Sequence, residues 1–325
     1  MHKNMESVKV YPIHTIQFWK NYAIQMRPYL LFISGIAGLS GMLMSKGSVQ
    51  LGWDSVIIFI PFFTGYGFGQ ALTDCFQTDT DKLSSPYRPL SKGIISVRST
   101  LIISVTGLLL SGIIFYLFSI TGFFLSMLIV FGLATYSYIK KHFWFAGPFY
   151  NSWIVALLPV IGFFSLTSED FKEYITDNSF FILVTFFSYT SFVLIGYLKD
   201  IDADRATNYK TFPVVFGWEK TVIAGDCIAL LTLLFFWISF NFDLTPLIAG
   251  LAGSIVIIYG QIAAHNIKEQ TIEEALIPIL STVRSFVLFH IAIILQFHSY
   301  LWPYALLYYG LFEWALYKRP SKYQV

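Results

Sequence analysis

Long apolar runs separated by short polar stretches make up most of this 325-residue chain. A run of about 17 to 25 apolar residues is long enough to cross the hydrocarbon core of a bilayer as a helix. Such runs lie at 27–46, 55–73, 99–118, 121–139, 149–167, 179–198, 221–240, 246–264, 277–297 and 300–317. Only His298 and Ser299 separate the last two runs, so these form either two helices or one broken element.

The pattern predicts an all-α fold, a polytopic transmembrane helical bundle with nine core helices and room for a tenth. Composition agrees, because 56% of the residues are hydrophobic and 12% are charged, against about 45–50% and about 25% in soluble domains. An ordinary soluble globular domain is therefore excluded. No long polar insert interrupts the runs, so residues 1–325 are predicted to form a single membrane domain.

The lysines and arginines set the expected orientation, because cytoplasmic loops of membrane proteins are enriched in them. With the N-terminus inside, alternate loops carry most of these residues, namely Lys82, Arg88, Lys92, Arg98, Lys140, Lys141, Lys199, Arg205, Lys210, Lys220 and Lys268. The remaining loops carry mainly acids, among them Asp54, Asp177 and Asp243. We therefore expect a multi-pass protein of the cell membrane. Its N-terminal segment 1–25 and its loops 74–98 and 199–220 are expected to face the cytoplasm.

Two polar stretches at the ends of predicted helices concentrate the acidic residues. The first reads T-D-C-F-Q-T-D-T-D-K-L-S-S-P-Y-R-P-L over 73–90, and the second reads G-Y-L-K-D-I-D-A-D-R-A-T-N-Y-K-T-F-P over 196–213. Each sets three carboxylates beside basic residues. Clustered carboxylates repel one another unless a cation lies between them. The two stretches therefore indicate metal ions held against an anionic ligand.

Helical spacing suggests how these acids are arranged. If the helix before the first stretch continues, Asp74, Gln77 and Asp81 lie on one face of it. Asp79 lies off that face and is equally well a ligand or a helix-flanking charge. In the second stretch Asp200 and Asp204 are four residues apart, with Asp202 between them.

Oxygen ligands of this kind suit Mg²⁺, which typically takes one or two carboxylates and completes its shell with water and substrate phosphate. Four nearby basic residues are suited to binding phosphate oxygens, namely Arg88, Lys199, Arg205 and Lys210. Metal and basic side chains beside apolar helices suit a diphosphate ester with a long hydrocarbon tail.

These stretches resemble the motifs of the UbiA superfamily of intramembrane prenyltransferases. The family pattern N-D-x-x-D-x-x-x-D followed by R-P-[IL]-x-x-G is matched at Thr73, Asp74, Gln77 and Asp81, and then by R-P-L-S-K-G over 88–93. The pattern [RK]-D-x-E-x-D-R-x-x-G-x-x-T is matched at Lys199, Asp200, Asp202, Asp204, Arg205, Asn208 and Thr211. Residues 136–141 are similar to the family's Y-P-x-x-K-R signature, and Arg27-Pro28 is also typical. Gln77 and Thr73 depart from the pattern, because the family has Asp and Asn there.

The resemblance implies a helical bundle around a central cavity capped by cytoplasmic loops. It also implies a Mg²⁺-dependent enzyme that moves an isoprenoid chain from a polyprenyl diphosphate to an aromatic or quinone-precursor acceptor and releases diphosphate. Two Mg²⁺ ions are expected on Asp74, Gln77, Asp81, Asp200, Asp202 and Asp204, of which Asp74, Asp81, Asp200 and Asp204 count as catalytic. The diphosphate is expected to bind Arg88, Lys140, Lys199, Arg205 and Lys210.

The expected partners are the isoprenoid diphosphate donor, a small aromatic or lipidic acceptor and membrane lipid, with no nucleic acid. Two other interpretations stay open. A UbiA-type terpene cyclase would capture the allylic cation with the substrate's own double bonds. A secondary transporter would also have many helices, but its site is expected near the bilayer midplane rather than at helix ends.

Four further polar residues fall in or beside apolar runs. Arg284 and Asp226 are interpreted either as functional charges inside the membrane or as interfacial residues at the starts of their helices, and the second interpretation is favoured for Arg284. His290 is interpreted as a packing residue, and Asn151 as either a helix cap or a cavity residue. No individual Phe or Tyr stands out as a partner for a carbocation.

Overall fold

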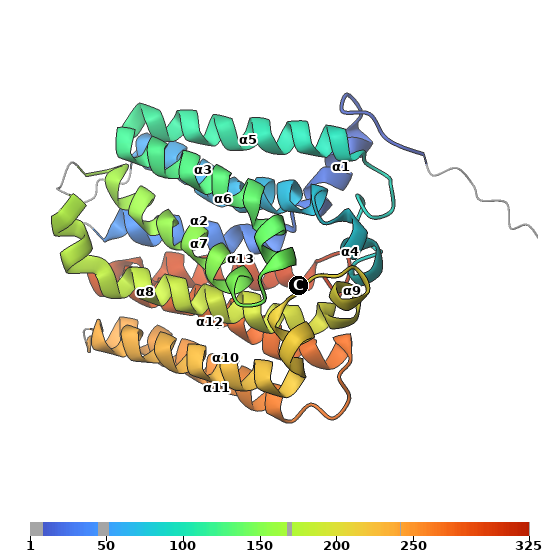
Figure 1. Cartoon of the computed structure of the whole chain (residues 1–325). Helices are drawn as coiled ribbons and strands as arrows, with labels where there is room; N and C mark the ends of the chain where they lie inside the picture. Colours follow the sequence, from blue (N-terminus) through green and yellow to red (C-terminus); the bar gives the residue numbers. More distant parts are fainter. Residues whose placement is uncertain (1–8, 45–51, 168–170, 241, 325) are drawn as a thin grey trace, which may run out of the picture.

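The computed structural model of the chain describes residues 9–44, 52–167, 171–240 and 242–324. Of the predicted N-terminal segment, residues 1–8 lie outside the described residues. Helices are the only regular secondary structure in the described part. Long helices lie side by side, and the short helices α4 and α9 are at one end (Figure 1). We call this the motif end, because both acidic stretches lie there.

The helices follow one another with short connections. Their bounds are α1 Ile16–Gln25, η1 Pro28–Leu30, α2 Leu31–Leu43, α3 Trp53–Cys75, α4 Thr78–Ser84, α5 Val97–Phe118, α6 Ile120–His142, α7 Ala146–Phe164, α8 Phe171–Gly196, η2 Tyr197–Asp200, α9 Ile201–Ala206, α10 Phe212–Ile238, α11 Leu244–His265, α12 Ile272–Phe297, η3 Ser299–Leu301 and α13 Trp302–Tyr317.

Eight helices in the described part are long and apolar enough to span a membrane. A ninth span results if α1 and the segment 28–43, which are bent by 55° relative to each other, count as one. The all-α polytopic bundle is therefore confirmed. The tenth apolar run forms α13, a separate helix of 16 residues that is too short to count among the candidate spans.

Burial separates an inner group of helices from an outer one. Between 72% and 78% of the apolar window is buried in α7, in α8 with its continuation, and in α12, but only 28% in α5. The exposed apolar side chains of the outer helices, such as Leu117 and Leu230, suit contact with lipid, where a leucine needs no protein partner. Two of the inner helices, α7 and α8, line the cavities of the bundle.

The structure decides the open interpretations of Arg284 and Asp226 differently. α12 begins at Ile272, so Arg284 lies well inside it, where its guanidinium forms a bidentate pair with Glu313 of α13 at 2.6 and 2.9 Å. α10 is kinked at Gly217, and Asp226 lies beyond the kink, 2.7 Å from His265 at the end of α11; both side chains are partly exposed, in agreement with an interfacial position. The exposed end of a helix need not be apolar, which hides its true start from a hydropathy pattern.

The structure also shows the surroundings of His290 and Asn151. His290 is fully buried, receives a 3.0 Å contact from Thr185 and lies 2.8 Å from the carbonyl of Phe286, in agreement with a packing residue. Asn151 lies in α7 and lines two adjoining cavities. It is therefore a cavity residue rather than a helix cap.

Candidate active site

The first acidic stretch is broken rather than continuous. α3 ends at Cys75, Gln77 has the non-helical angles φ −121° and ψ 21°, and α4 starts at Thr78. The prediction of one continuing helix with Asp74, Gln77 and Asp81 on one face was therefore wrong. The break turns α4 across the end of the bundle, so that Asp74 and Asp81 approach the same arginine.

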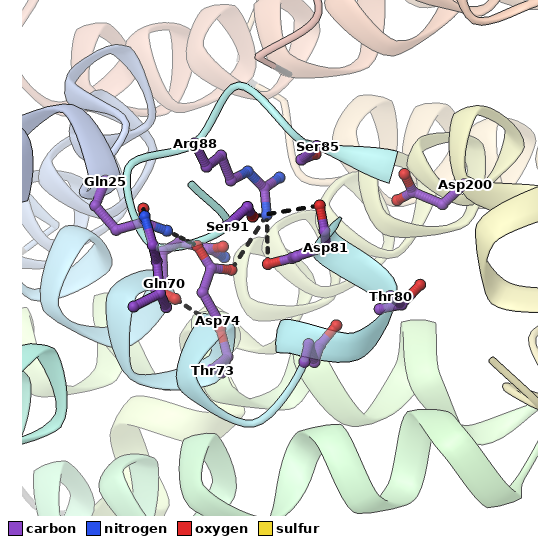
Figure 2. A network of polar contacts seen from close by, with 12 residues as sticks. Gln25, Gln70, Thr73, Asp74, Thr80, Asp81, Ser85, Arg88, Ser91 and Asp200 are labelled. Carbon is purple, nitrogen blue, oxygen red and sulfur yellow. Dashed lines mark hydrogen bonds and ion pairs between the residues drawn. The ribbon is translucent and has the colours of Figure 1, made fainter. Parts of the chain in front are cut away.

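That arginine is Arg88, which lies in the turn after α4. Its Nη1 is 2.8 Å from Asp81 Oδ2 and 3.5 Å from Asp74 Oδ1. Figure 2 shows Arg88 reaching between the two carboxylates, with Asp200 on a separate segment beyond Asp81. Further along the turn, Gly93 has φ 72°, a conformation that glycine adopts without strain. The glycine of the R-P-L-S-K-G stretch thus shapes the turn that carries Arg88.

Asp74 has two further partners, Gln25 at the end of α1 and Arg27 in the link between α1 and η1. Gln25 Nε2 donates to it, and Arg27 Nη2 donates to both of its oxygens at 2.8 and 3.0 Å. Arg27 has the left-handed angles φ 54° and ψ 73°, which cost about 1–3 kcal/mol in a non-glycine residue. The following Pro28 disfavours a helical Arg27, and the ion pair with Asp74 offsets the strain. Gln25 was missed by the sequence analysis because it lies in a polar segment with no motif.

The second acidic stretch approaches from the other side of the site. Lys199 Nζ is 3.2 Å from Asp200, and Lys140 of α6 is 3.3 Å from Asp204. Asp204 is fully buried and also accepts hydrogen bonds from the hydroxyls of Thr80 and Thr211. Buried carboxylates are stable only when their oxygens are paired in this way, so Asp204 joins α4, α6 and α9.

One pocket contains most of these groups, and we call it the polar pocket. Its charged lining consists of four acids and four bases, namely Asp74, Asp81, Asp200, Asp204, Arg27, Arg88, Lys140 and Lys199. Gln77 also lines it, and its Nε2 donates to Ser137. Each acid of the pocket is within 3.5 Å of at least one base.

Four other residues of the two stretches do not line the polar pocket. The side chain of Asp202 is 97% exposed and that of Arg205 is 61% exposed, and Lys210 is also exposed. Asp79 lies 3.2 Å from Lys141 on the outside of α4. The structure therefore separates Asp202, Arg205 and Lys210 from the other predicted site residues, and it favours the helix-flanking interpretation of Asp79.

Aromatic side chains line the inner part of the polar pocket. The hydroxyls of Tyr66 and Tyr189 are 3.0 Å apart, and those of Tyr136 and Tyr197 are 2.8 Å apart. All four tyrosines and Phe192 line the pocket. With 33 Phe and 20 Tyr in the chain, no pattern in the sequence distinguishes these rings from the others. Only their positions in the bundle distinguish them.

A second, apolar cavity continues from the polar pocket, and we call it the apolar cavity. The two share Tyr66, Gln70, Asn151 and Tyr189. Successive turns of α3 line the apolar cavity at residues 69–70, 65–66 and 61–62, and α5, α6 and α7 line its other sides. Pro61 and Phe62 are the lining residues of α3 farthest from Asp74, and the ring of Phe62 lies 4.8 Å, between centroids, from that of Phe115 on α5. A polar site thus opens directly onto an elongated apolar space.

Comparison with known proteins agrees with the family resemblance of the motifs. Residues 31–281 match the family described as the UbiA prenyltransferase family. The chain belongs to this family. It is therefore an integral multi-pass membrane protein and an enzyme that transfers prenyl groups.

Individual relatives are distant. The digeranylgeranylglyceryl phosphate synthase of Pyrococcus furiosus is 24% identical over 215 residues, which cover 66% of this chain and 76% of that protein. The apo structure of a UbiA homolog from Aeropyrum pernix K1 is 16% identical with a TM-score of 0.67, over 78% of this chain and 94% of that one. The structure of a UbiA homolog from Archaeoglobus fulgidus bound to GPP and Mg²⁺ is 17% identical with a TM-score of 0.61, over 83% and 99% of the two chains. These structures share the fold.

Proposed function

We propose that this prenyltransferase takes an isoprenoid chain from its diphosphate, which binds with Mg²⁺ in the polar pocket, and transfers it to a lipidic acceptor. The observation that supports this best is the junction of the two cavities through Tyr66, Gln70, Asn151 and Tyr189. An isoprenoid diphosphate is itself a charged head joined to an apolar tail. We also propose that the motif end faces the cytoplasm, because the lysine-rich and arginine-rich loops lie there.

The donor atoms of the polar pocket fit Mg²⁺. Among the described residues no three acidic, histidine or cysteine side chains form a cage that would hold a metal by themselves. Mg²⁺ does not need such a cage, because one or two carboxylates with water and substrate phosphate complete its shell. Asp74 and Asp81 on one side and Asp200 and Asp204 on the other would hold two ions against the diphosphate, with the amide oxygen of Gln77 nearby. When bound, Mg²⁺ would supply positive charge to the diphosphate oxygens as the C–O bond breaks.

The charge balance of the pocket favours the same combination. Its four acids and four bases neutralise one another, so a bare diphosphate would add uncompensated negative charge to a buried site. Such a charge is costly without a counterion. A divalent metal that enters with the diphosphate removes this cost.

The protein's own cations would hold the leaving group. Arg88, Lys140 and Lys199 line the pocket, and the Nε atoms of Arg27 and Arg88 are buried without a hydrogen-bond partner in the described part of the chain. These N–H groups are available to donate to diphosphate oxygens. The rings of Tyr66, Tyr136, Tyr189 and Tyr197 would present π faces to the allylic cation, while the apolar cavity excludes water that would otherwise capture it.

The apolar cavity suggests a donor of defined length. Along the apolar cavity, from Gln70 to Pro61, the helix α3 advances about 14 Å. An isoprene unit contributes four chain bonds of about 1.5 Å and spans about 5 Å when extended. With the allylic unit beside the tyrosines of the polar pocket, the cavity suits about three further units, which makes four in all, as in geranylgeranyl diphosphate. An elongated cavity favours transfer of an extended chain over its cyclisation.

A groove beside the polar pocket supports an anionic acceptor. It shares Ser84 and Lys199 with the pocket and is also lined by Arg205, by Asp202, which lies 3.4 Å from Arg205, and by Gln270, so its charged lining has a net positive charge. A phosphate-bearing head would find both Lys199 and Arg205 there. The name of the Pyrococcus furiosus relative contains a glyceryl phosphate, whereas the sequence analysis predicted an aromatic or quinone-precursor acceptor.

The test is diphosphate release from labelled geranylgeranyl diphosphate by the purified enzyme in detergent with Mg²⁺. We expect release when a prenylated glyceryl phosphate is supplied and little release with a hydroxybenzoate or without an acceptor. Release with the hydroxybenzoate alone would establish the aromatic acceptor instead. A cyclic hydrocarbon formed without any acceptor would establish a cyclase, and no release under any condition would contradict the proposed reaction.

Mg²⁺ binding is expected to weaken in acid because of Asp81. Burial is the main influence on this group, and against the opposing effect of Arg88 it raises the pKa of Asp81 to about 6. Below this pH a proton must leave before the metal binds, so the apparent Mg²⁺ affinity should fall about tenfold per pH unit. Titration calorimetry with Mg²⁺ alone measures this affinity, because pyrophosphate takes up protons in the same pH range.

The same pKa also affects the stability of the metal-free protein. Because the folded pKa lies above the ordinary value of 3.8, protonation of Asp81 favours the folded state. This contribution to stability is fully present below the ordinary pKa and is lost as the pH rises through about 6.

The Asp81→Asn variant, which cannot titrate at this position, should lose the fall in Mg²⁺ affinity at acid pH. An unchanged fall in this variant would assign the effect to another group.

A further inference from the structure

The C-terminal tail, residues 319–324, runs back from α13 to the motif end of the bundle (Figure 1). It forms a compact turn there. Arg319 donates to the carbonyls of Leu316 and Lys322, and the backbone N–H of Gln324 donates to the carbonyl of Ser321 at 3.0 Å. Gln324 is only 1% exposed. The tail is therefore packed into the protein rather than extended into solvent.

One contact of the tail reaches the turn that carries Arg88. The hydroxyl of Tyr87 donates to the carbonyl oxygen of Tyr323 at 2.7 Å. Tyr87 is the immediate neighbour of Arg88 but does not line the polar pocket. Its hydroxyl also receives a 3.4 Å contact from Ser85, whose carbonyl accepts the backbone N–H of Arg88 at 3.1 Å. The tail thus fastens the 85–88 turn from outside the pocket.

A second contact reaches the turn that carries Arg27. Gln324 Nε2 donates to the carbonyl of Ile24 at 2.9 Å. The same carbonyl accepts the backbone N–H of Arg27 at 3.2 Å, which is the residue held in a left-handed conformation. A third contact, from the Tyr323 hydroxyl to Glu273, fixes the tail to the start of α12.

Arg27 and Arg88 are the two arginines that bind Asp74, and the tail contacts the turn of each. We propose that Tyr87, Tyr323 and Gln324 are positioning residues that hold the two arginine turns at the spacing that a diphosphate requires. This inference rests on the proposed function of the polar pocket. A strained turn and a surface loop would otherwise sample several positions, and preorganised donors bind an anion better than mobile ones.

The test uses the Tyr87→Phe and Gln324→Ala variants of the full-length enzyme and a chain that ends after Lys318. The probe is inorganic pyrophosphate with Mg²⁺, measured by direct titration and as a competitor of the isoprenoid diphosphate. Each point variant should raise the pyrophosphate dissociation constant about 3- to 10-fold, as expected for one lost hydrogen bond. The KM of the donor should rise in parallel while kcat changes by less than about twofold.

Two controls separate positioning from general stability. Tyr304→Phe removes the hydroxyl of an exposed tyrosine on α13, and its pyrophosphate affinity should stay within about twofold of the unmodified enzyme. In the shortened chain, Tyr87→Phe should have little additional effect, because the carbonyl of Tyr323 is already gone and only the 3.4 Å contact with Ser85 remains. A melting temperature that stays within a few degrees in the point variants excludes global unfolding as the cause.

Hydrogen exchange gives a readout that does not depend on catalysis. The backbone amides of residues 85–93 should exchange faster in Tyr87→Phe and in the shortened chain. Faster exchange with unchanged pyrophosphate affinity would overturn the positioning role, and so would an unchanged result in both measurements. Failure of the unmodified enzyme to bind pyrophosphate would overturn the proposed function itself. Failure of the positioning role alone would leave binding by the unmodified enzyme intact, so the two outcomes can be distinguished.

Discussion

Asp200→Asn is expected to lower kcat/KM for the isoprenoid diphosphate by about 100- to 1000-fold, the size of effect seen when a preorganised charge contact to a transition state is lost. The substitution keeps the shape of the side chain but removes the negative charge that we propose holds Mg²⁺ against the diphosphate. It also leaves Lys199, 3.2 Å away, without its carboxylate partner. Release of labelled diphosphate under single-turnover conditions measures the loss in the chemical step.

Asp202→Asn is the matched control for this experiment. Asp202 lies two residues further along the same polar stretch, but its side chain is 97% exposed and is absent from the lining of the polar pocket. With the acceptor at saturation, the same substitution should therefore change kcat/KM for the isoprenoid diphosphate by less than about twofold, because Asp202 lines the proposed acceptor groove and not the diphosphate pocket. Equal losses at both positions would contradict the arrangement described here and restore Asp202 as a metal ligand.

Gly65→Phe is expected to shorten the range of accepted donors. Gly65 lines the apolar cavity, and a Cβ atom added there meets no other atom within 4 Å, so the new ring enters the cavity without displacing the backbone. It lies about 13 Å along α3 from Asp74. We expect kcat/KM for geranylgeranyl diphosphate to fall at least about 100-fold while that for geranyl diphosphate stays within about threefold, because only the longer chain meets the ring.

Gly310→Phe is the control for the added aromatic ring. Gly310 lies on an exposed face of α13, and an added Cβ atom there also meets no other atom within 4 Å. This variant should keep the chain-length preference of the unmodified enzyme. If Gly65→Phe reduced activity with both donors equally, the apolar cavity would not be the binding site of the tail.

The main features of the fold follow from the sequence because they depend on local rules. A helix that crosses lipid must satisfy its own backbone hydrogen bonds and present apolar side chains, so a long apolar run in the sequence predicts its position. The residues at which these helices begin and end were predicted less well. α12 begins at Ile272 rather than at 277, so Arg284 lies deeper in the helix than the apolar run indicated, and there it pairs with Glu313. The polar first turns of a helix carry no hydropathy signal.

Much of the candidate site also follows from the sequence. The motif spacing identified Asp74, Asp81, Asp200 and Asp204, and all four line the polar pocket. Lys140, which is far from both acidic stretches in the chain, was found only through the family resemblance. Asp202 and Arg205 fit the family motif equally well but point away from the pocket. A motif specifies which residue types occur, whereas the side-chain direction depends on where the short helix α9 lies.

The membrane class of the protein, its spanning helices and the residue types of a diphosphate site can all be read from the amino-acid order, because each produces a periodic or compositional pattern. Tertiary structure alone decided which side chains meet. Gln25 of α1 and Arg27 just before η1 reach Asp74. Tyr66 contacts Tyr189 across the bundle, and Tyr87 contacts the C-terminal tail. Such contacts join residues from 47 to 236 positions apart. They are set by the packing of whole helices, which no local pattern records.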